Sequence, residues 1–92
     1  MTYKNSNRRD KNETEIIAFW RSVGCLWIQM PPSAGFDGLL IDGPVMHIVE
    51  IKNPAGRMVL TDREQTLKNQ IEIRGGNYNI IRTLDEAGRL HW

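Results

Sequence analysis

The fold prediction starts from FDGLLIDGPVMHIVEIK, residues 36–52. Residues 36–42 and 45–52 are mostly apolar, and each segment has the length of a strand. Gly43 and Pro44 between them favour a tight turn, and two strands joined this closely form an antiparallel hairpin. The chain is therefore expected to be built around a β-hairpin.

Two opposite charges stand at the end of the second strand of this hairpin. Glu50 and Lys52 project from the same face, because side chains alternate along a strand. Both faces are apolar upstream, which predicts a central strand covered on both sides. Counting outward from the turn places Asp37 opposite Glu50. Two carboxylates so close need a cation between them, and hard oxygen ligands suit Mg²⁺ or Mn²⁺. A simple ion pair between Glu50 and Lys52 is the alternative.

The rest of the chain predicts an α/β fold with a small mixed four-stranded sheet flanked by helices. The order is helix, three strands, helix, strand, and a short C-terminal helix. Periodicity, capping residues and turn signals give the other elements: a helix that starts at Asn12 and stops at Gly24, a strand over 25–30, a helix from Thr61 to Arg74, a strand over 77–83 and a helix over 84–91.

The first helix carries an acidic residue on its apolar side. Asn12 and Glu15 have the spacing of a capping box. At 100° per residue, Glu13 projects into the stripe that contains Ile16 and Trp20, whereas Glu15 points away from it. An inward carboxylate in a first helical turn is explained either by the helix dipole or by a function at a site.

The first twelve residues are basic and lack hydrophobic periodicity, which predicts a flexible arm followed by one domain over 13–92. The arm either contacts phosphates through residues such as Arg8 and Arg9 or is a solvated terminus. At 92 residues the chain has room for one thin core, and small domains of this kind often gain stability as homo-oligomers.

The single cysteine, Cys25, excludes an internal disulfide. We also expect no metal site from this thiol and the two histidines, His47 and His91, because they are scattered along the sequence. No apolar stretch reaches the length of a membrane span, and the N-terminus lacks the apolar segment of a signal peptide. These features predict a reducing, cytoplasmic location.

Asp37 followed by Glu50-Ile51-Lys52 resembles the signature of the PD-(D/E)XK nuclease superfamily. The first helix with its acidic residue and the Thr61-x-x-x-Gln65 helix start add to the likeness. It is closest to the minimal stand-alone VRR-Nuc proteins, often found in phages, and extends over about residues 12–92. It implies a restriction-endonuclease-like core. Phe36 stands where the family name expects proline, a residue that shapes the strand and does no chemistry.

The resemblance implies a role for each matching residue. Asp37, Glu50 and the backbone carbonyl of Ile51 would hold the metal ion, with Glu13 contributing directly or through water. Lys52 would orient the attacking water, help to lower its pKa or steady negative charge. Gln65 would position this lysine or a water, although a helical wheel places it opposite Leu67 and Ile71. Glu15 is the alternative to Glu13.

The family hydrolyses phosphodiester bonds in DNA with divalent metal ions. The resemblance thus implies a metal-dependent endonuclease that acts on branched DNA such as a Holliday junction. Because a domain this small offers one cut per subunit, a homodimer with two sites is expected to nick two strands symmetrically. Phosphate contacts are expected from the arm and from basic residues of the domain: Arg57, Lys68, Arg74 and Arg82. A non-catalytic nucleic-acid-binding subunit is the first alternative and a structural assembly protein the second. Both leave the repelling carboxylates without a purpose.

Overall fold

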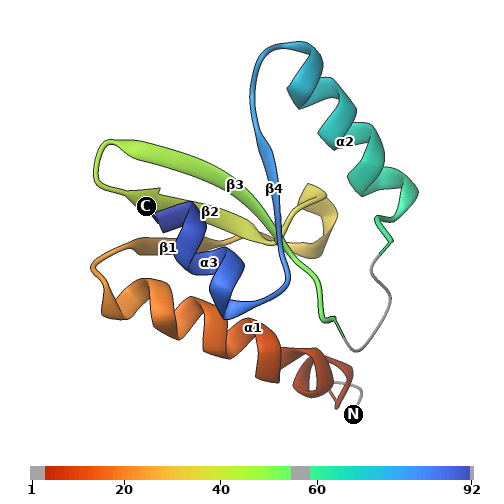
Figure 1. Ribbon diagram of the computed structural model, residues 1–92. Coiled ribbons are helices and arrows are strands. Elements are labelled where there is room, and N and C mark those ends of the chain that lie inside the picture. Colours follow the sequence, from red (N-terminus) through yellow and green to blue (C-terminus); the bar gives the residue numbers. More distant parts are fainter. Residues whose placement is uncertain (1–3, 55–58, 92) are drawn as a thin grey trace.

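The computed structural model describes residues 4–54 and 59–91, with side chains from residue 12 onward. The elements follow the predicted order, and Figure 1 shows their arrangement. They are α1 (Lys4–Ser22), β1 (Leu26–Gln29), a 3-10 turn η1 (Pro32–Ala34), β2 (Gly38–Asp42), β3 (Val45–Ile51), α2 (Asp62–Ile73), β4 (Tyr78–Ile81) and α3 (Leu84–His91).

The four strands form one open mixed sheet in the order β1-β2-β3-β4. β1, β2 and β3 run antiparallel to their neighbours, and β4 pairs parallel to β3 after the crossover through α2. The predicted α/β class and the mixed four-stranded sheet flanked by helices are therefore confirmed.

The hairpin has the predicted register. Asp42 pairs with Val45 across the turn, and Gly38 pairs with Val49 at the other end. Gly43 has a φ of 61°, which its position as first central residue of a two-residue hairpin loop requires. One further step along the same register puts Asp37 opposite Glu50.

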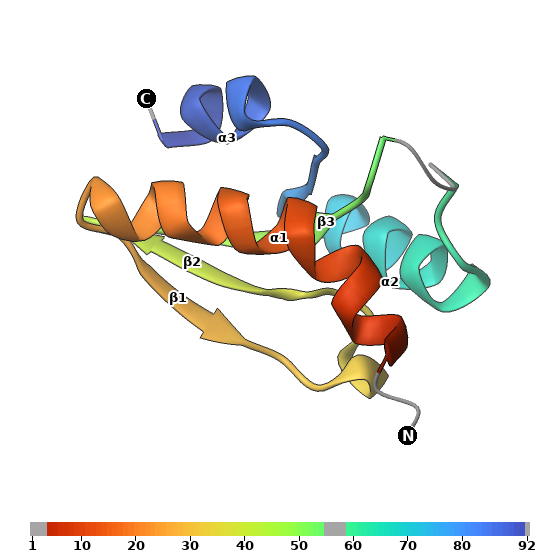
Figure 2. The same ribbon diagram turned by 90° about the horizontal axis from the view of Figure 1, so that it is seen from below.

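The core lies on one face of the sheet, beneath α1 and α3, whereas α2 stands apart beside β4 (Figures 1 and 2). The indole of Trp20 on α1 stacks on that of Trp27 with ring centroids 5.5 Å apart, and its Nε1 donates to the carbonyl of Ala87 on α3 at 3.0 Å. Gly38 is required beside this stack, because a Cβ there would meet the Trp27 ring at 2.4 Å. The tryptophan pair thus joins both helices to the sheet.

The start of α1 differs from the prediction. The helix begins at Lys4, so the segment expected to be a flexible arm is helical from that residue, and Asn12 is not a helix cap. Arginine and lysine are good helix formers, and they extend the helix without an apolar stripe. The Asn12 side-chain amide instead donates to the backbone carbonyl of Lys52 at 3.2 Å, which links α1 to the end of β3.

The second face of the sheet is open near the hairpin, so the prediction that both faces of β3 are covered is wrong. Met46 is 63% exposed, and on the same face Leu26 is 57% and Ile28 41% exposed. The uncovered face results from the position of α2, which contacts the sheet at β4 and reaches no other strand as closely.

Among the described residues, no helix has both the length and the apolar character that a membrane crossing requires.

Candidate active site

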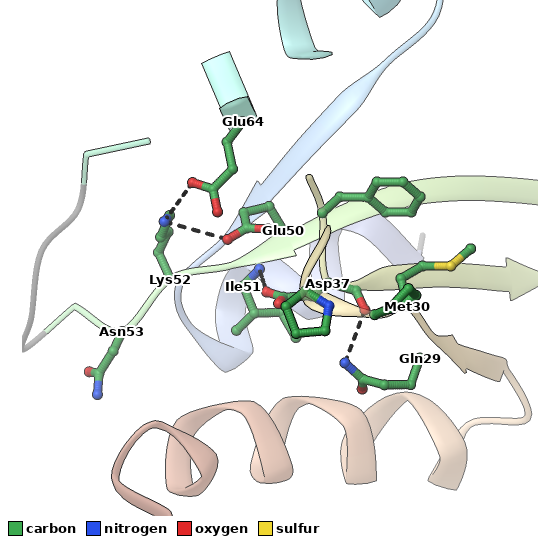
Figure 3. Close-up of a pocket in the computed structure, with 11 residues that line it drawn as sticks. Gln29, Met30, Asp37, Glu50, Ile51, Lys52, Asn53 and Glu64 are labelled. Carbon is green, nitrogen blue, oxygen red and sulfur yellow. Dashed lines mark hydrogen bonds and ion pairs between the residues drawn. The ribbon is translucent and has the colours of Figure 1, made fainter. Parts of the chain in front are cut away.

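A cleft of about 490 Å³ opens at the end of the sheet where β2 begins and β3 ends (Figure 3). Its described lining comes from β1 and the loop after it, the start of β2, the end of β3 and the first turn of α2: Gln29, Met30, Pro31, Pro32, Phe36, Asp37, Glu50, Ile51, Lys52, Asn53 and Glu64. The three residues Asp37, Glu50 and Lys52, which the sequence predicted as one site, therefore share one cavity.

Asp37 is held at the edge of β2 by backbone contacts on two sides. Its N–H donates to the carbonyl of Val49 at 3.0 Å, and its carbonyl accepts from the N–H of Met30 at 2.9 Å. Its carboxylate oxygen Oδ2 accepts from the N–H of Ile51 at 2.7 Å. This last bond fixes the Asp37 carboxylate against the strand that carries Glu50.

Glu50 is only 4% exposed. Burial raises its pKa, the negative charge of Asp37 raises it further, and the pKa reaches about 8 despite the opposing effect of Lys52. At neutral pH this carboxyl group is therefore mostly protonated in the metal-free chain. A pKa raised by a second carboxylate marks a place where a bound cation would favour ionisation of both groups.

Lys52 lies between two carboxylates. Its Nζ is 2.9 Å from Oε1 of Glu64 and 3.4 Å from Oε2 of Glu50, as the dashed lines in Figure 3 show. Burial lowers the pKa of Lys52, but the hydrogen bond to Glu64 and the charges of both carboxylates outweigh burial and leave the pKa raised. The ammonium is therefore charged at neutral pH.

Glu64 is the site residue that sequence reasoning missed. It forms the predicted capping box with Thr61: its N–H donates to the Thr61 hydroxyl at 3.2 Å, and its Oε1 accepts from the Thr61 N–H at 2.9 Å. The same Oε1 accepts from Lys52. The capping-box spacing identified Glu64 as a helix residue, but no pattern in the sequence places α2 close enough to β3 for this contact.

Gln65 does not line the cleft. Its side chain is exposed and donates through Nε2 to Oδ1 of Asn69 at 2.9 Å, one turn further along α2. The helical wheel that placed Gln65 opposite Leu67 and Ile71 explains this orientation. The position expected for Gln65 beside Lys52 is taken by Glu64 instead.

Glu13 faces inward, as predicted, and is 8% exposed, whereas Glu15 is exposed. It lies on α1, the helix that packs on the core face of the sheet, and is not among the described residues that line the cleft. Its role at the metal, direct or through water, stays a prediction. Ile51 lines the cleft, although its side chain also belongs to the core.

The residues expected to contact phosphates either do not line the cleft or have side chains outside the described part of the chain. Lys68 lies on α2 and pairs with Glu72 at 2.9 Å. Arg8 and Arg9 belong to the first turns of α1, but their side chains lie outside the description, as does all of Arg57. Their contacts with DNA therefore stay predictions.

Three carboxylates and one ammonium are found among the described residues lining the cleft. When all four groups are ionised, the negative charge exceeds the positive charge. Asp37, Glu50 and backbone carbonyl groups nearby are hard oxygen donors, which is the donor set that Mg²⁺ and Mn²⁺ prefer. The arrangement thus fits a divalent metal ion and places one fixed positive charge beside it.

Comparison of the chain with models of protein families, with curated proteins and with solved structures finds no match.

Proposed function

We propose that this protein is a divalent-metal-dependent DNA endonuclease with a restriction-endonuclease-like core of the VRR-Nuc type. One observation carries the proposal: Asp37 and Glu50 share a cleft in which the pKa of Glu50 is raised to about 8, with the charged Lys52 next to them. Both carboxyl groups ionise at neutral pH only when a nearby cation compensates their charge, so the pair is suited to holding one.

Asp37 and Glu50 would hold the metal ion, together with the backbone carbonyl of Ile51. A Mg²⁺ or Mn²⁺ ion bound there would neutralise phosphate charge and lower the pKa of a coordinated water toward neutrality. The hydrogen bond from the Ile51 N–H keeps the Asp37 carboxylate in place for this task.

Lys52 acts as a fixed cation rather than as a general base, because its raised pKa keeps the ammonium protonated. Its task is to orient the attacking water and to stabilise negative charge that develops on the phosphate. Glu64 positions the Lys52 ammonium, since a long flexible side chain held by one carboxylate alone has more freedom.

Branched DNA is the proposed substrate, and a homodimer is the proposed active form. One cleft with these carboxylates is formed by the described residues and would offer one cut, so two symmetric copies would cut two strands. The exposed apolar face around Leu26 and Met46 is the surface that a second copy would cover. Action on DNA would take place in the cytoplasm of a bacterium or of a host cell.

The test is cleavage of a four-way junction and of a matched linear duplex, each with Mg²⁺, Mn²⁺ or a chelator. Wild type is compared with Asp37→Asn and Glu50→Ala, and Gln65→Ala is the control outside the cleft. We expect metal-dependent cutting of the junction that falls by at least about 1,000-fold in both cleft variants, since unassisted phosphodiester hydrolysis is extremely slow. Full activity of either cleft variant would refute the proposal.

A non-catalytic nucleic-acid-binding subunit is the second candidate, because the ion pairs of Lys52 also suit a structural role for this residue. An ammonium already paired with Glu50 and Glu64 resembles a structural ion pair at a strand end. This alternative predicts salt-sensitive binding of DNA without cleavage in any metal. It also predicts unchanged DNA affinity in Glu50→Ala. Retained binding fits both candidates, so the deciding result is cutting: wild type that cuts DNA and a Glu50→Ala variant that binds DNA without cutting it support the nuclease.

A further inference from the structure

A second cluster of possible metal ligands lies at the other end of β2 from the cleft. Cys25 precedes β1, Asp42 ends β2 and His91 ends α3. Figure 1 shows the end of α3 close to the turn end of the β2–β3 hairpin, whereas the cleft is lined by residues at the start of β2. The expectation that Cys25 and His91 are too scattered to share a site is wrong, because α3 folds back over the core and brings His91 to the thiol.

The donor atoms of these three residues converge on one point. Nδ1 of His91 lies 3.8 Å from Sγ of Cys25 and 2.8 Å from Oδ2 of Asp42, and all three atoms lie within 4.8 Å of one another. In a tetrahedral zinc site with bonds of about 2.0–2.3 Å, neighbouring ligand atoms are roughly 3.3–3.7 Å apart. Changes of up to about 1 Å in these separations would bring the three atoms to such distances.

The geometry excludes a nucleophilic triad. In a triad the histidine passes a proton between two partners through its two different ring nitrogens. Here the thiol and the carboxylate both approach Nδ1 of His91, so this nitrogen is shared and no relay connects Cys25 with Asp42. Convergence of three different donors on one point is instead the arrangement that a metal ion requires.

The exposure of the three side chains also suits an ion. Cys25 is only 7% exposed, and its thiol points into the cluster. The side chains of His91 and Asp42 are 17% and 22% exposed, which leaves one side of the cluster accessible to solvent. An ion could therefore reach the site and keep a water as its fourth ligand.

We propose that Cys25, Asp42 and His91 form a binding site for one borderline transition-metal ion, of which Zn²⁺ is the best fit. Thiolate and imidazole ligands select Zn²⁺ over Mg²⁺, whereas the oxygen donors of the cleft have the opposite preference. The two sites thus differ in metal class. Bound Zn²⁺ would join the segment before β1, the end of β2 and the end of α3, and so stabilise the packing of α3 against the sheet.

The test is titration of the reduced, metal-free protein with Co²⁺, whose thiolate complexes give a sulfur-to-cobalt charge-transfer absorption in the near ultraviolet. Oxygen ligands give no such band, so the cleft cannot produce it. We expect one equivalent of Co²⁺ to generate the band in wild type and in the cleft variant Asp37→Asn/Glu50→Gln. Zn²⁺ should then abolish the band by displacing Co²⁺.

Variants of the ligands decide the assignment. Cys25→Ser should remove the band, and Asp42→Asn and His91→Gln should each weaken Co²⁺ binding at least about tenfold. His47→Gln, which changes the other histidine, should leave both the band and the Co²⁺ affinity unchanged. Absence of the band in wild type, or a band that persists at full affinity in both Asp42→Asn and His91→Gln, would overturn the proposal.

Thermal unfolding provides a second readout that does not depend on the sulfur-to-cobalt absorption band. Zn²⁺ should raise the Tm of wild type, because a ligand that binds only the folded state stabilises it. The rise should vanish in His91→Gln, whose own fold is checked by circular dichroism. An equal rise in wild type and His91→Gln would show that Zn²⁺ binds elsewhere and would overturn the proposal.

Discussion

Glu64 holds the ammonium of Lys52 at 2.9 Å with the same oxygen, Oε1, that caps the backbone N–H of Thr61. One carboxylate thereby joins the start of α2 to the end of β3. Because Lys52 also contacts Glu50, the start of the helix sets the position of the cation beside the proposed metal ligands. The contact gives α2, which has no buried residue, a direct part in the cleft.

Replacement of Glu64 tests this link. Glu64→Ala should lower cleavage by roughly tenfold to a hundredfold, because Lys52 loses the partner that limits its freedom. Thr61→Ala removes the other half of the capping box but leaves the contact between Glu64 and Lys52, so its cleavage rate should stay close to that of wild type despite a stability loss of about 1 kcal/mol. Gln65→Ala should have little effect on either quantity. A cleavage defect in Thr61→Ala as large as in Glu64→Ala would show that Glu64 acts only through the helix.

Proton release should accompany metal binding at neutral pH. The pKa of Glu50 is about 8 in the metal-free cleft, so a divalent ion must displace a proton from this carboxyl group at pH 7. Isothermal titration calorimetry in buffers of different ionisation enthalpy should detect close to one proton released per Mn²⁺ at pH 6.5–7, and almost none above about pH 9.

The apparent affinity for Mn²⁺ should depend on the protonation state of Glu50. We expect it to rise up to about tenfold per pH unit below pH 8 and to level off above it. Glu50→Gln, which cannot release a proton, should bind the ion weakly and without this pH dependence. Equal proton release by wild type and Glu50→Gln would assign the proton to another group.

Glu50 should also make the metal-free protein less stable at alkaline pH. Its pKa is raised from 4.5 in the unfolded chain to about 8 in the folded one, so the protonated form is favoured by folding. This contribution to stability is fully present below pH 4.5, falls as the pH rises through about 8, and is lost above it. Glu50→Gln should therefore be more stable than wild type at pH 9, by on the order of 2 kcal/mol, with a much smaller difference at pH 4.5.

Urea unfolding in the presence of a chelator at several pH values measures this difference. Glu72→Gln is the matched control, because Glu72 forms a partly exposed ion pair with Lys68 on α2 that contributes only a few tenths of a kcal/mol. Saturating Mn²⁺ should reduce or reverse the advantage of Glu50→Gln, since only wild type has both carboxylates to hold the ion. A stability gap that does not change with pH would contradict the raised pKa.

The open face of the sheet should control the proposed dimer. Leu26→Lys and Met46→Glu each place a charge on the apolar surface that a second copy would cover. Light scattering and sedimentation at several concentrations should show dimers for wild type and monomers for both variants. Ile73→Lys is the control, because Ile73 is 81% exposed on α2, a helix that contacts the sheet at β4. A monomeric wild type at all concentrations would refute the dimer.

The local elements of this protein were readable from the sequence because they depend on short-range rules. The Gly43-Pro44 turn sets the hairpin register, and that register places Asp37 opposite Glu50. The alternation of side chains puts Glu50 and Lys52 on one face. The spacing between Thr61 and Glu64 predicted a helix cap that the structure confirms. The first turns of α1 escaped prediction because they contain good helix formers but no apolar stripe.

Contacts between elements distant in the sequence were decided by the tertiary structure alone. The approach of α2 to β3 brings Glu64 rather than Gln65 to Lys52, and the return of α3 over the core brings His91 to Cys25 and Asp42. Neither contact follows from spacing. The position of α3 depends on how it packs with Trp20 and its neighbours against the sheet, and that of α2 depends on its contacts with β4 and with the end of β3. Periodicity orients a side chain only within its own element, so the charges at the strand ends follow from the sequence, whereas the groups that surround them follow from the packing of the elements.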